Sequence, residues 1–334
     1  MKNAKSNNNG SNPSMILTDY LIPNISSQWR LAKQVGVNHA TVRLPDDGSF
    51  DVTNLSQMMA LSNLYLSYQI KPIIIEPLPN SLHDHIKCGD NKRDESIEKV
   101  IKMIPILAKC GYRVICVNFM AKIGWFRTST MIEERGGAKV TGFNIADAQI
   151  DPSLEISEKE LWDNLSYFLR AVVPIAEKHD VSIALHPDDP PIKKLGNISR
   201  ILISKNNLQK ALDIYPSKNL GITMCQATFA AMGEDVCDCI EHFGFQGKIK
   251  FVHFRDIRGT KECFHETFHD NGMTDMDSTI KQYKKIGYKG PIRVDHVPSM
   301  EGEKNDKPGY ETIGRLYAIG YLRGLCEANG YNLE

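Results

Sequence analysis

The sequence has no surplus of charge of either sign, because its 40 Lys and Arg balance 40 Asp and Glu over 334 residues. Binding to nucleic acid or to an anionic membrane surface depends on clustered basic side chains, so this balance argues against both partners. No run of about 18 apolar residues occurs, and the opening MKNAKSNNNGSNPS lacks the apolar core of a signal peptide. We therefore expect a cytoplasmic protein.

Cysteine and glycine-rich motifs are also scarce. Eight cysteines in so long a chain are too few for a disulfide scaffold, and we expect them to be reduced thiols. Neither G-x-G-x-x-G nor G-x-x-x-x-G-K-[ST] occurs anywhere in the sequence. The dinucleotide-binding and P-loop classes therefore have no support.

The sequence does contain a regular alternation of short β-branched runs with longer segments of helical spacing. Residues 1–14, rich in Asn and Ser, are predicted to be a disordered tail, and residues 15–330 a single domain. Helical segments are expected between the strands and after the last one. The expected strands cover residues 16–20, 39–44, 71–77, 113–119, 181–186, 219–225, 248–254 and 291–296.

Eight such strand and helix units predict an α/β fold, a single (β/α)8 TIM barrel. Several strands are almost continuously apolar, as parallel strands buried on both faces are, and right-handed crossovers can close eight of them into a barrel. An open doubly wound sheet is the structural alternative. Long loops are expected after strands four and seven, over 120–156 and 255–276, at the end where barrel enzymes build their active sites. The stretch LHDHIKCGD is expected to be a solvated loop.

Strands five to eight each end in a residue that can bind a metal: His186, Cys225, His253 and Asp295. The ends of barrel strands converge on one rim, so these four side chains can surround one cation. Singly, a histidine at a strand end is more often a structural residue, and a lone cysteine a small buried hydrophobe. Two imidazoles, a thiolate and a carboxylate suit Mn²⁺ or Fe²⁺ better than Ca²⁺ or Mg²⁺, and they are also acceptable to Zn²⁺.

Other residues near these strand ends suit an acidic, hydroxylated substrate. Guanidinium groups match carboxylates in a bidentate geometry, although each of these side chains taken singly is as well explained by a structural or surface role. The candidate substrate-binding residues are Asn118, Arg127, Arg255 and His269. The candidate proton-transfer residues are His296 and Tyr310.

These motifs carry a resemblance to a known family. The strings DHIKCG, VICVNFM followed by WFRT, ALHPDDPP, HFRD, FHETFHDNGMTDM, VDH and KPGYETIGRL resemble the mannonate dehydratases, xylose-isomerase-like barrels. The resemblance covers roughly residues 80–328. It implies conversion of D-mannonate to 2-keto-3-deoxy-D-gluconate in hexuronate breakdown, with Mn²⁺ or a similar ion and a homo-oligomer, a dimer. By motif, the family's metal ligands fall on His186, Cys225, His253 and Asp295, and its proton-transfer residues on His296 and Tyr310.

The sequence departs from the family pattern at Val117, Gly124, Phe126, Val297 and Pro298. The four expected metal ligands remain, while part of the shell facing the substrate differs. Two alternatives to the dehydratase therefore stay open. One is an isomerase or epimerase that uses the same barrel and metal chemistry, and the other is a catalytically silent protein that binds a sugar acid.

Overall fold

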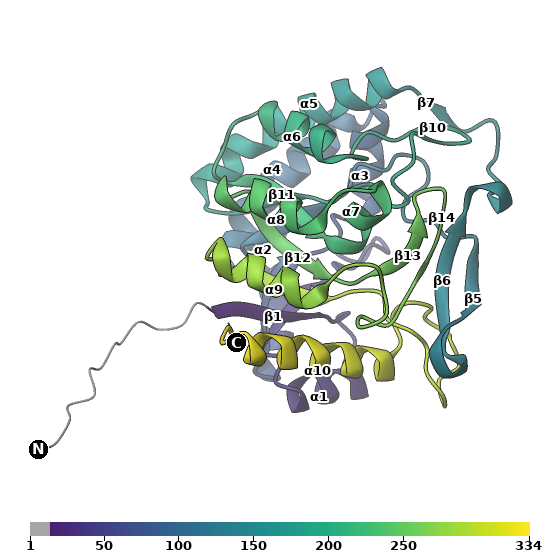
Figure 1. The fold of residues 1–334 in the computed structure, drawn as a ribbon. Helices are drawn as coiled ribbons and strands as arrows, with labels where there is room; N and C mark the ends of the chain where they lie inside the picture. The colour runs from purple at the N-terminus through teal and green to yellow at the C-terminus, as the bar shows by residue number, and fades with distance from the viewer. Residues whose placement is uncertain (1–13) are drawn as a thin grey trace, which may run out of the picture.

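The computed structural model describes residues 14–334, and within them eight parallel strands form a closed barrel (Figure 1). Neighbouring strands pair in chain order, and the barrel closes where β15 pairs with β1 through Pro291 and Ile16. The predicted (β/α)8 barrel is thus confirmed. Its strands are β1 Ser14–Tyr20, β2 His39–Val42, β3 Lys71–Ile75, β4 Val114–Val117, β8 Ser182–Leu185, β11 Leu220–Cys225, β12 Ile249–Phe254 and β15 Pro291–Val294.

Helices connect the strands and surround the barrel (Figure 1). The strands are apolar because both of their faces are buried, one against these helices and one inside the barrel. A buried cluster from five residues includes Val114 and Phe251 and fills the interior. The helices are α1 Ser27–Gln34, α2 Leu55–Ser67, α3 Asn80–Cys88, α4 Arg93–Lys109, α5 Glu158–Lys178, α6 Lys205–Asp213, α7 Gln226–Met232, α8 Val236–Phe245, α9 Met276–Lys285 and α10 Thr312–Ala328.

The two long connections after β4 and β12 meet in a second, antiparallel sheet, visible beside the barrel in Figure 1. Its strands are β5 Ser129–Glu133, β6 Lys139–Asn144, β13 Ile257–Thr260 and β14 Cys263–Glu266. The two connections join where Phe143 of β6 pairs with Phe264 of β14, and both side chains are buried in one hydrophobic cluster. The sheet fixes two segments that are far apart in the sequence at the C-terminal end of the barrel.

The expectation of a solvated loop at LHDHIKCGD is wrong, because residues 82–88 of this stretch lie in α3 and Gly89 caps the helix. The helix buries Leu82, His83, Ile86 and Lys87. These positions recur at the period of a helix, but two of them are polar residues. The sequence therefore lacks the apolar periodicity by which a helix is recognised. His83 is fully buried beside Phe119.

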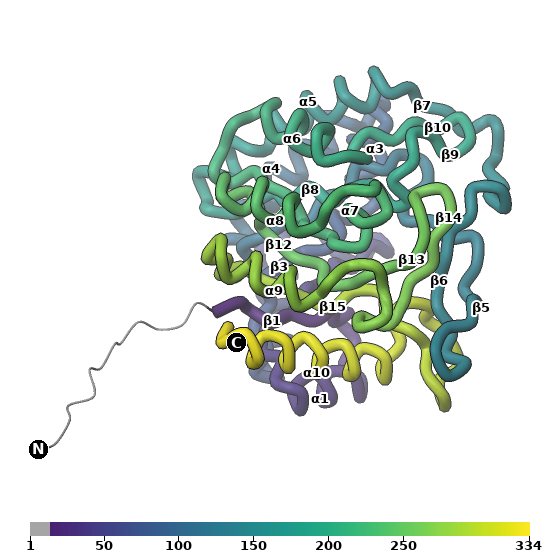
Figure 2. The backbone as a smooth tube through the Cα atoms, in the orientation of Figure 1, coloured from purple at the N-terminus to yellow at the C-terminus, as the bar shows by residue number. Residues whose placement is uncertain are grey.

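The two ends of the described chain lie side by side (Figure 2). Ser14, the last residue of the expected tail, begins β1 and pairs with Asn332 of the short strand β16 Asn332–Leu333, while residues 1–13 lie outside the described residues. Three further short strands, β7 Glu155–Ile156, β9 Lys194–Leu195 and β10 Asn197–Ser199, form a small sheet. All eight cysteines lie within the described residues, and none of them forms a disulfide. None of the helices in residues 14–334 combines the length and the apolarity that crossing a membrane requires.

Candidate active site

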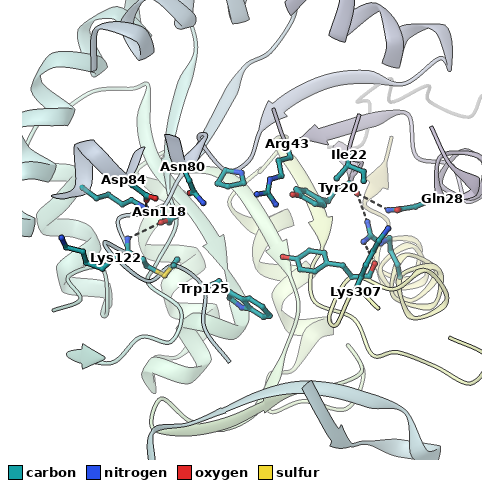
Figure 3. Close-up of a pocket in the computed structure, with 16 residues that line it drawn as sticks. Tyr20, Ile22, Gln28, Arg43, Asn80, Asp84, Asn118, Lys122, Trp125 and Lys307 are labelled. Atoms are coloured by element: carbon teal, nitrogen blue, oxygen red, sulfur yellow. Dashed lines mark hydrogen bonds and ion pairs between the residues drawn. The ribbon is translucent and has the colours of Figure 1, made fainter. Parts of the chain in front are cut away.

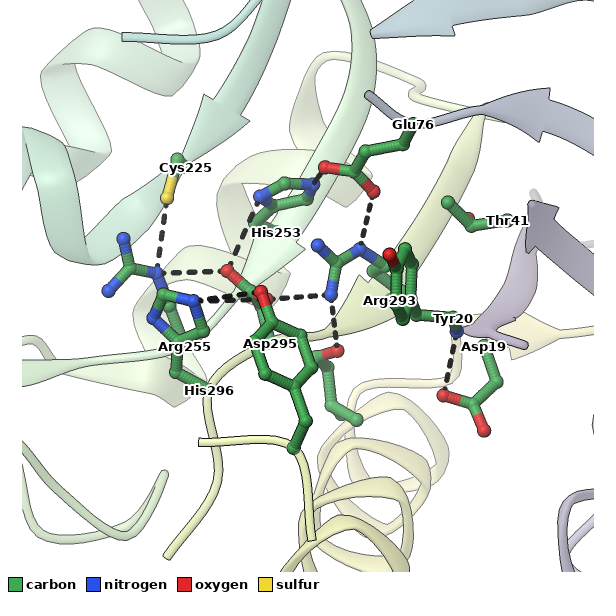
Figure 4. A network of polar contacts seen from close by, with 12 residues as sticks. Asp19, Tyr20, Thr41, Glu76, Cys225, His253, Arg255, Arg293, Asp295 and His296 are labelled. Atoms are coloured by element: carbon green, nitrogen blue, oxygen red, sulfur yellow. Dashed lines mark hydrogen bonds and ion pairs between the residues drawn. The ribbon is translucent and has the colours of Figure 1, made fainter. Parts of the chain in front are cut away.

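The four expected metal ligands lie at the C-terminal end of the barrel, and Figure 4 shows three of them, Cys225, His253 and Asp295. Cys225 ends β11, His253 lies near the end of β12, and His186 and Asp295 follow β8 and β15 directly. His253 Nδ1 lies 3.2 Å from His186 Nε2 and 3.5 Å from Asp295 Oδ2. One ligand atom each from His186, Cys225 and His253 lies within 4.8 Å of the other two. The barrel therefore brings three of the four side chains within reach of one cation, and Asp295 lies beside His253.

Neighbouring acceptors determine which imidazole nitrogen of each histidine carries its proton. His186 Nδ1 lies 2.6 Å from the carbonyl oxygen of Pro187, which can only accept. His253 Nε2 lies 2.9 Å from Oε1 of Glu76, a carboxylate that favours a proton on the facing nitrogen. The other two nitrogens, 3.2 Å apart, therefore both present lone pairs. Two facing lone pairs beside a thiol and a carboxylate form a donor set that fits a cation.

Glu76 and Arg293 belong to this site, and the sequence analysis missed both. Arg293 Nε donates to Glu76 Oε2 at 2.9 Å, and its Nη1 donates to Asp295 Oδ1 at 2.7 Å (Figure 4). Arg293 thus holds one oxygen of Asp295 and leaves the other facing His253. The available signal was a charged letter inside an apolar strand, in PIIIEP and in PIRV. Such a letter indicates a paired charge inside the barrel.

Arg127 and Arg255, which the sequence suggested as carboxylate-binding residues, are held by carboxylates of the chain itself. Arg127 donates to Asp189 at 2.6 and 2.9 Å and to Glu266 at 2.6 Å. Arg255 donates to Asp189 at 2.6 Å and to both oxygens of Glu266, at 2.7 and 2.9 Å. All four side chains are almost fully buried. Their contacts form a buried ion-pair network, in which Arg127 Nε has no hydrogen-bond partner within residues 14–334.

Arg255 also acts on the expected metal ligands. Its Nε lies 3.2 Å from Cys225 Sγ and 3.2 Å from Asp295 Oδ2. Burial by itself raises the pKa of the Cys225 thiol, but the charge of Arg255 and the contact with His253 together outweigh burial and lower that pKa below its usual value. Arg255 therefore favours a thiolate at this position.

The connected network carries surplus negative charge. Burial raises the pKa of each carboxyl in this network, but the neighbouring cations, chiefly the guanidiniums, lower it by more than burial raises it. The pKa of Glu266 falls to about 2, and those of Glu76, Asp189 and Asp295 fall below the usual range. Three guanidiniums, those of Arg127, Arg255 and Arg293, face these four ionised carboxylates. A thiolate at Cys225 would raise the imbalance from one negative charge to two. A buried site with that imbalance is stabilised by a divalent cation.

His296 and Tyr310, the expected proton-transfer residues, lie next to each other. His296 Nδ1 lies 2.9 Å from Glu266 Oε1, and its Nε2 lies 3.0 Å from the Tyr310 hydroxyl. Because Glu266 is ionised, Nδ1 donates to it and Nε2 accepts from the hydroxyl. His296 has a left-handed backbone, with φ +35°, which is rare for a residue other than glycine and which directs its ring toward Tyr310.

Two adjoining cavities lead to these groups. The inner cavity, about 140 Å³, is lined by His186, His253, Asp295, His296 and Tyr310, among others. The outer cavity, about 530 Å³, opens beyond it (Figure 3). Both are lined by Tyr20, Pro77, Asn118, Met120, Trp125 and Tyr310, which therefore form the passage between them.

The four expected substrate-binding residues differ in their access to these cavities. Asn118 lines both cavities, and Arg255 lines the inner one. Arg127 and His269 line neither of them. His269 is fully buried against Phe254, and burial lowers its pKa to about 4. Arg127 and His269 therefore lie behind the residues that line the two cavities.

The fold and the donor set define a closed (β/α)8 barrel protein with a candidate metal site at the C-terminal end of its strands. Likenesses at low identity show the fold alone: D-psicose 3-epimerase from Clostridium cellulolyticum H10 superposes with a TM-score of 0.61 at 12% identity, over 93% of this chain and 99% of that one. The model of the family D-mannonate dehydratase (UxuA) matches residues 26–153 and 146–332. The chain belongs to the mannonate dehydratase family.

Individual relatives agree with this assignment. Mannonate dehydratase 2 from Halalkalibacterium halodurans is 34% identical over 302 residues, which cover 81% of this chain and 86% of that protein. Mannonate dehydratase from Thermotoga neapolitana is 33% identical over 83% of this chain and 87% of its own length. The crystal structure of mannonate dehydratase from Streptococcus suis serotype 2 superposes with a TM-score of 0.87 at 27% identity, over 96% of this chain and 97% of that one.

Proposed function

We propose that this protein dehydrates D-mannonate to 2-keto-3-deoxy-D-gluconate in hexuronate breakdown. One observation carries the proposal: three of the four proposed ligands, His186, His253 and Asp295, line the same inner cavity as the histidine–tyrosine pair. Membership of the mannonate dehydratase family supports the choice of substrate. A cytoplasmic location and a homodimeric assembly, both expected from the sequence, stay predictions.

In this proposal a divalent ion, Mn²⁺ or Fe²⁺, is held by His186, Cys225, His253 and Asp295. The facing lone pairs of the two imidazoles and the buried negative charge support a cation at this position. Nitrogen, sulfur and oxygen donors together suit these borderline ions, and Zn²⁺ fits the donor types less specifically. When bound, the ion supplies Lewis-acid stabilisation to the charge that develops on the sugar acid.

The reaction removes a proton from C2 and hydroxide from C3 of the acid. The C2 proton is weakly acidic and hydroxide is a poor leaving group, so both a base and an acid are needed. His296 and Tyr310 share these roles in our proposal: one takes the C2 proton as the C2–H bond breaks, and the other protonates the C3 oxygen, which leaves as water. The resulting enol becomes the 2-keto acid when a proton is added at C3.

The contacts of His296 prepare it for this proton transfer. Glu266 accepts from Nδ1, so Nε2 is the nitrogen that exchanges a proton with the Tyr310 hydroxyl, 3.0 Å away. Trp125 lies over the His296 ring, with 5.0 Å between the ring centroids, and limits its access to water. Asn118, which lines both cavities, is placed to bind a hydroxyl group of the acid.

Incubation of the Mn²⁺-loaded protein with D-mannonate, followed by detection of a 2-keto-3-deoxy acid, tests the proposal directly. Tyr310→Phe is expected to lower kcat by roughly 10²- to 10⁴-fold, as loss of an acid–base group does. The matched control is Tyr167→Phe, which removes an exposed hydroxyl on the outer helix α5 and should leave kcat unchanged. Absence of product from the wild-type protein, or normal turnover by Tyr310→Phe, would count against the proposal.

Metal analysis tests the ligand set separately. Cys225→Ala is expected to lose the ion after dialysis, because the thiolate is one of its four proposed ligands. Cys263→Ala, an exposed thiol on β14, should keep it. Equal metal content in the two variants would contradict the assignment of Cys225.

A further inference from the structure

The outer cavity differs in charge from the inner one. Five cationic side chains line it, whereas Asp84 is the one carboxylate among its lining residues. Two of the cations are already paired: Lys87 lies 2.7 Å from Asp84, and Arg315 lies 2.7 Å from Asp19. Three of the five cationic side chains remain outside these ion pairs.

The remaining cations are Arg43, Lys122 and Lys307, and none of them forms an ion pair with a carboxylate within residues 14–334. They come from three separate segments, which follow β2 and β4 or precede α10, yet they surround one cavity (Figure 3). In the inner cavity, by contrast, every guanidinium is paired with carboxylates. The positive charge of the outer cavity is therefore available to a ligand.

Lys122 has a further unusual feature. Its backbone is left-handed, with φ +63°, a conformation that side-chain-bearing residues rarely adopt. Strained residues of this kind gather at binding sites, where the surrounding structure holds them in place. The turn around Lys122, in which Ile123 N–H donates to Ala121 O at 2.7 Å, presents the lysine to the outer cavity.

We propose that the outer cavity is a subsite for a second anionic group, a phosphate or a carboxylate, so that the preferred substrate is a sugar acid that carries this group where D-mannonate has its terminal hydroxymethyl group. This inference rests on the proposed function, because it takes the inner cavity as the place where C1 to C3 of a sugar acid react. The two cavities share the passage lined by Tyr20, Trp125 and Tyr310, so one extended molecule can reach from the inner cavity into the outer one. Arginine and lysine bind phosphate and carboxylate oxygens through charge-assisted hydrogen bonds, which a terminal hydroxymethyl group makes only weakly.

The test compares three acids that share the reacting end: D-mannonate, the corresponding six-carbon diacid, and D-mannonate 6-phosphate. Dissociation constants are measured by calorimetry on the Mn²⁺-loaded protein, and keto-acid formation is measured in parallel. We expect at least one of the two dianions to bind roughly 10- to 100-fold more tightly than D-mannonate, the range for charge-assisted hydrogen bonds. The diacid and the phosphate arms show which anion the subsite takes.

In the double variant Arg43→Gln with Lys122→Gln, the dissociation constant of the preferred dianion should come close to that of D-mannonate, so that their ratio is near one. The control is Lys218→Gln, an exposed lysine just before β11 at the opposite end of the barrel, which should leave the ratio as in the wild type. Equal affinity for all three acids, or a preference that persists in the double variant, would overturn the inference. Failure to form any keto acid while the preference is retained would overturn the dehydratase proposal instead, since binding is read separately.

Discussion

Glu266 is the residue whose neutralisation tests the buried charge network most directly. Its Oε1 accepts hydrogen bonds from Arg127 at 2.6 Å, from Arg255 at 2.7 Å and from His296 at 2.9 Å. Glu266→Gln keeps the shape of the side chain and removes its charge. The guanidinium of Arg255 would then face an amide nitrogen at one of the two positions where it now meets an oxygen.

The expected loss of stability follows from the pKa of this carboxyl. Burial raises that pKa, but Arg255, His296 and Arg127 lower it from 4.5 to about 2 in the folded protein. The difference corresponds to about 3 kcal/mol of stability. Since the folded pKa lies below the unfolded one, the contribution is complete above about pH 4.5 and is lost as the pH falls toward 2. Breaking one side of a buried ion pair costs a comparable amount, about 3–5 kcal/mol.

Thermal unfolding of Glu266→Gln at pH 7 measures this loss. The unfolding entropy of a 334-residue chain is roughly 0.7 kcal/mol/K, so the Tm should fall by about 4 to 7 °C. Glu133→Gln is the matched control, because it makes the same change at an exposed position of the same antiparallel sheet, where the side chain is 78% exposed. If the Tm of Glu266→Gln equals that of this control, the reasoning from buried charge is refuted.

Three further outcomes are expected. Glu76→Gln should weaken Mn²⁺ binding by about 10- to 100-fold in a chelator competition assay, because the proton of His253 Nε2 loses its anionic partner; unchanged affinity would remove Glu76 from the site. Stripping the ion should lower the Tm by about 6 °C relative to protein at roughly 1,000 times the metal Kd, and an unaltered Tm would mean that no ion binds the folded state. Gly259→Ala should lower the free energy of unfolding in denaturant by about 1–3 kcal/mol, because Gly259 has φ +119° and a Cβ there would collide with the carbonyl oxygen of Cys263. The control Gly124→Ala should lower it less, because a Cβ at Gly124 meets no atom within 4 Å.

The fold could be predicted from the sequence because the strand and the helix of each barrel unit have their own local sequence patterns. Apolar β-branched runs and helical spacing recur along the chain and favoured a closed barrel. The pairing of β15 with β1 in the structure decided against the open doubly wound sheet. The helix at 80–88 could not be recognised, because its buried face includes His83 and Lys87, whose burial depends on neighbours from other elements such as Phe119. The antiparallel sheet was missed for a related reason, since β6 finds its partner β14 more than a hundred residues away.

In the site, sequence motifs located the strand-end residues and the pair His296 and Tyr310, whose roles stay predictions. They did not show which charges were already satisfied. Arg127 and Arg255 looked available for a substrate until the structure placed Asp189 and Glu266 against them. A local motif identifies a charge but says nothing about its distant counterion.

The sequence by itself determined the barrel and the chemical identity of the side chains at its mouth, because both depend on the order of residues along short segments. The tertiary structure alone decided how those charges compensate one another. Arg127 and Asp189 are 62 residues apart, and Arg293 and Glu76 are 217 apart, yet each pair meets within 3 Å. Coulomb interactions depend on distance in space, so the surplus negative charge of the inner cavity and the unpaired cations of the outer one emerge when the barrel closes.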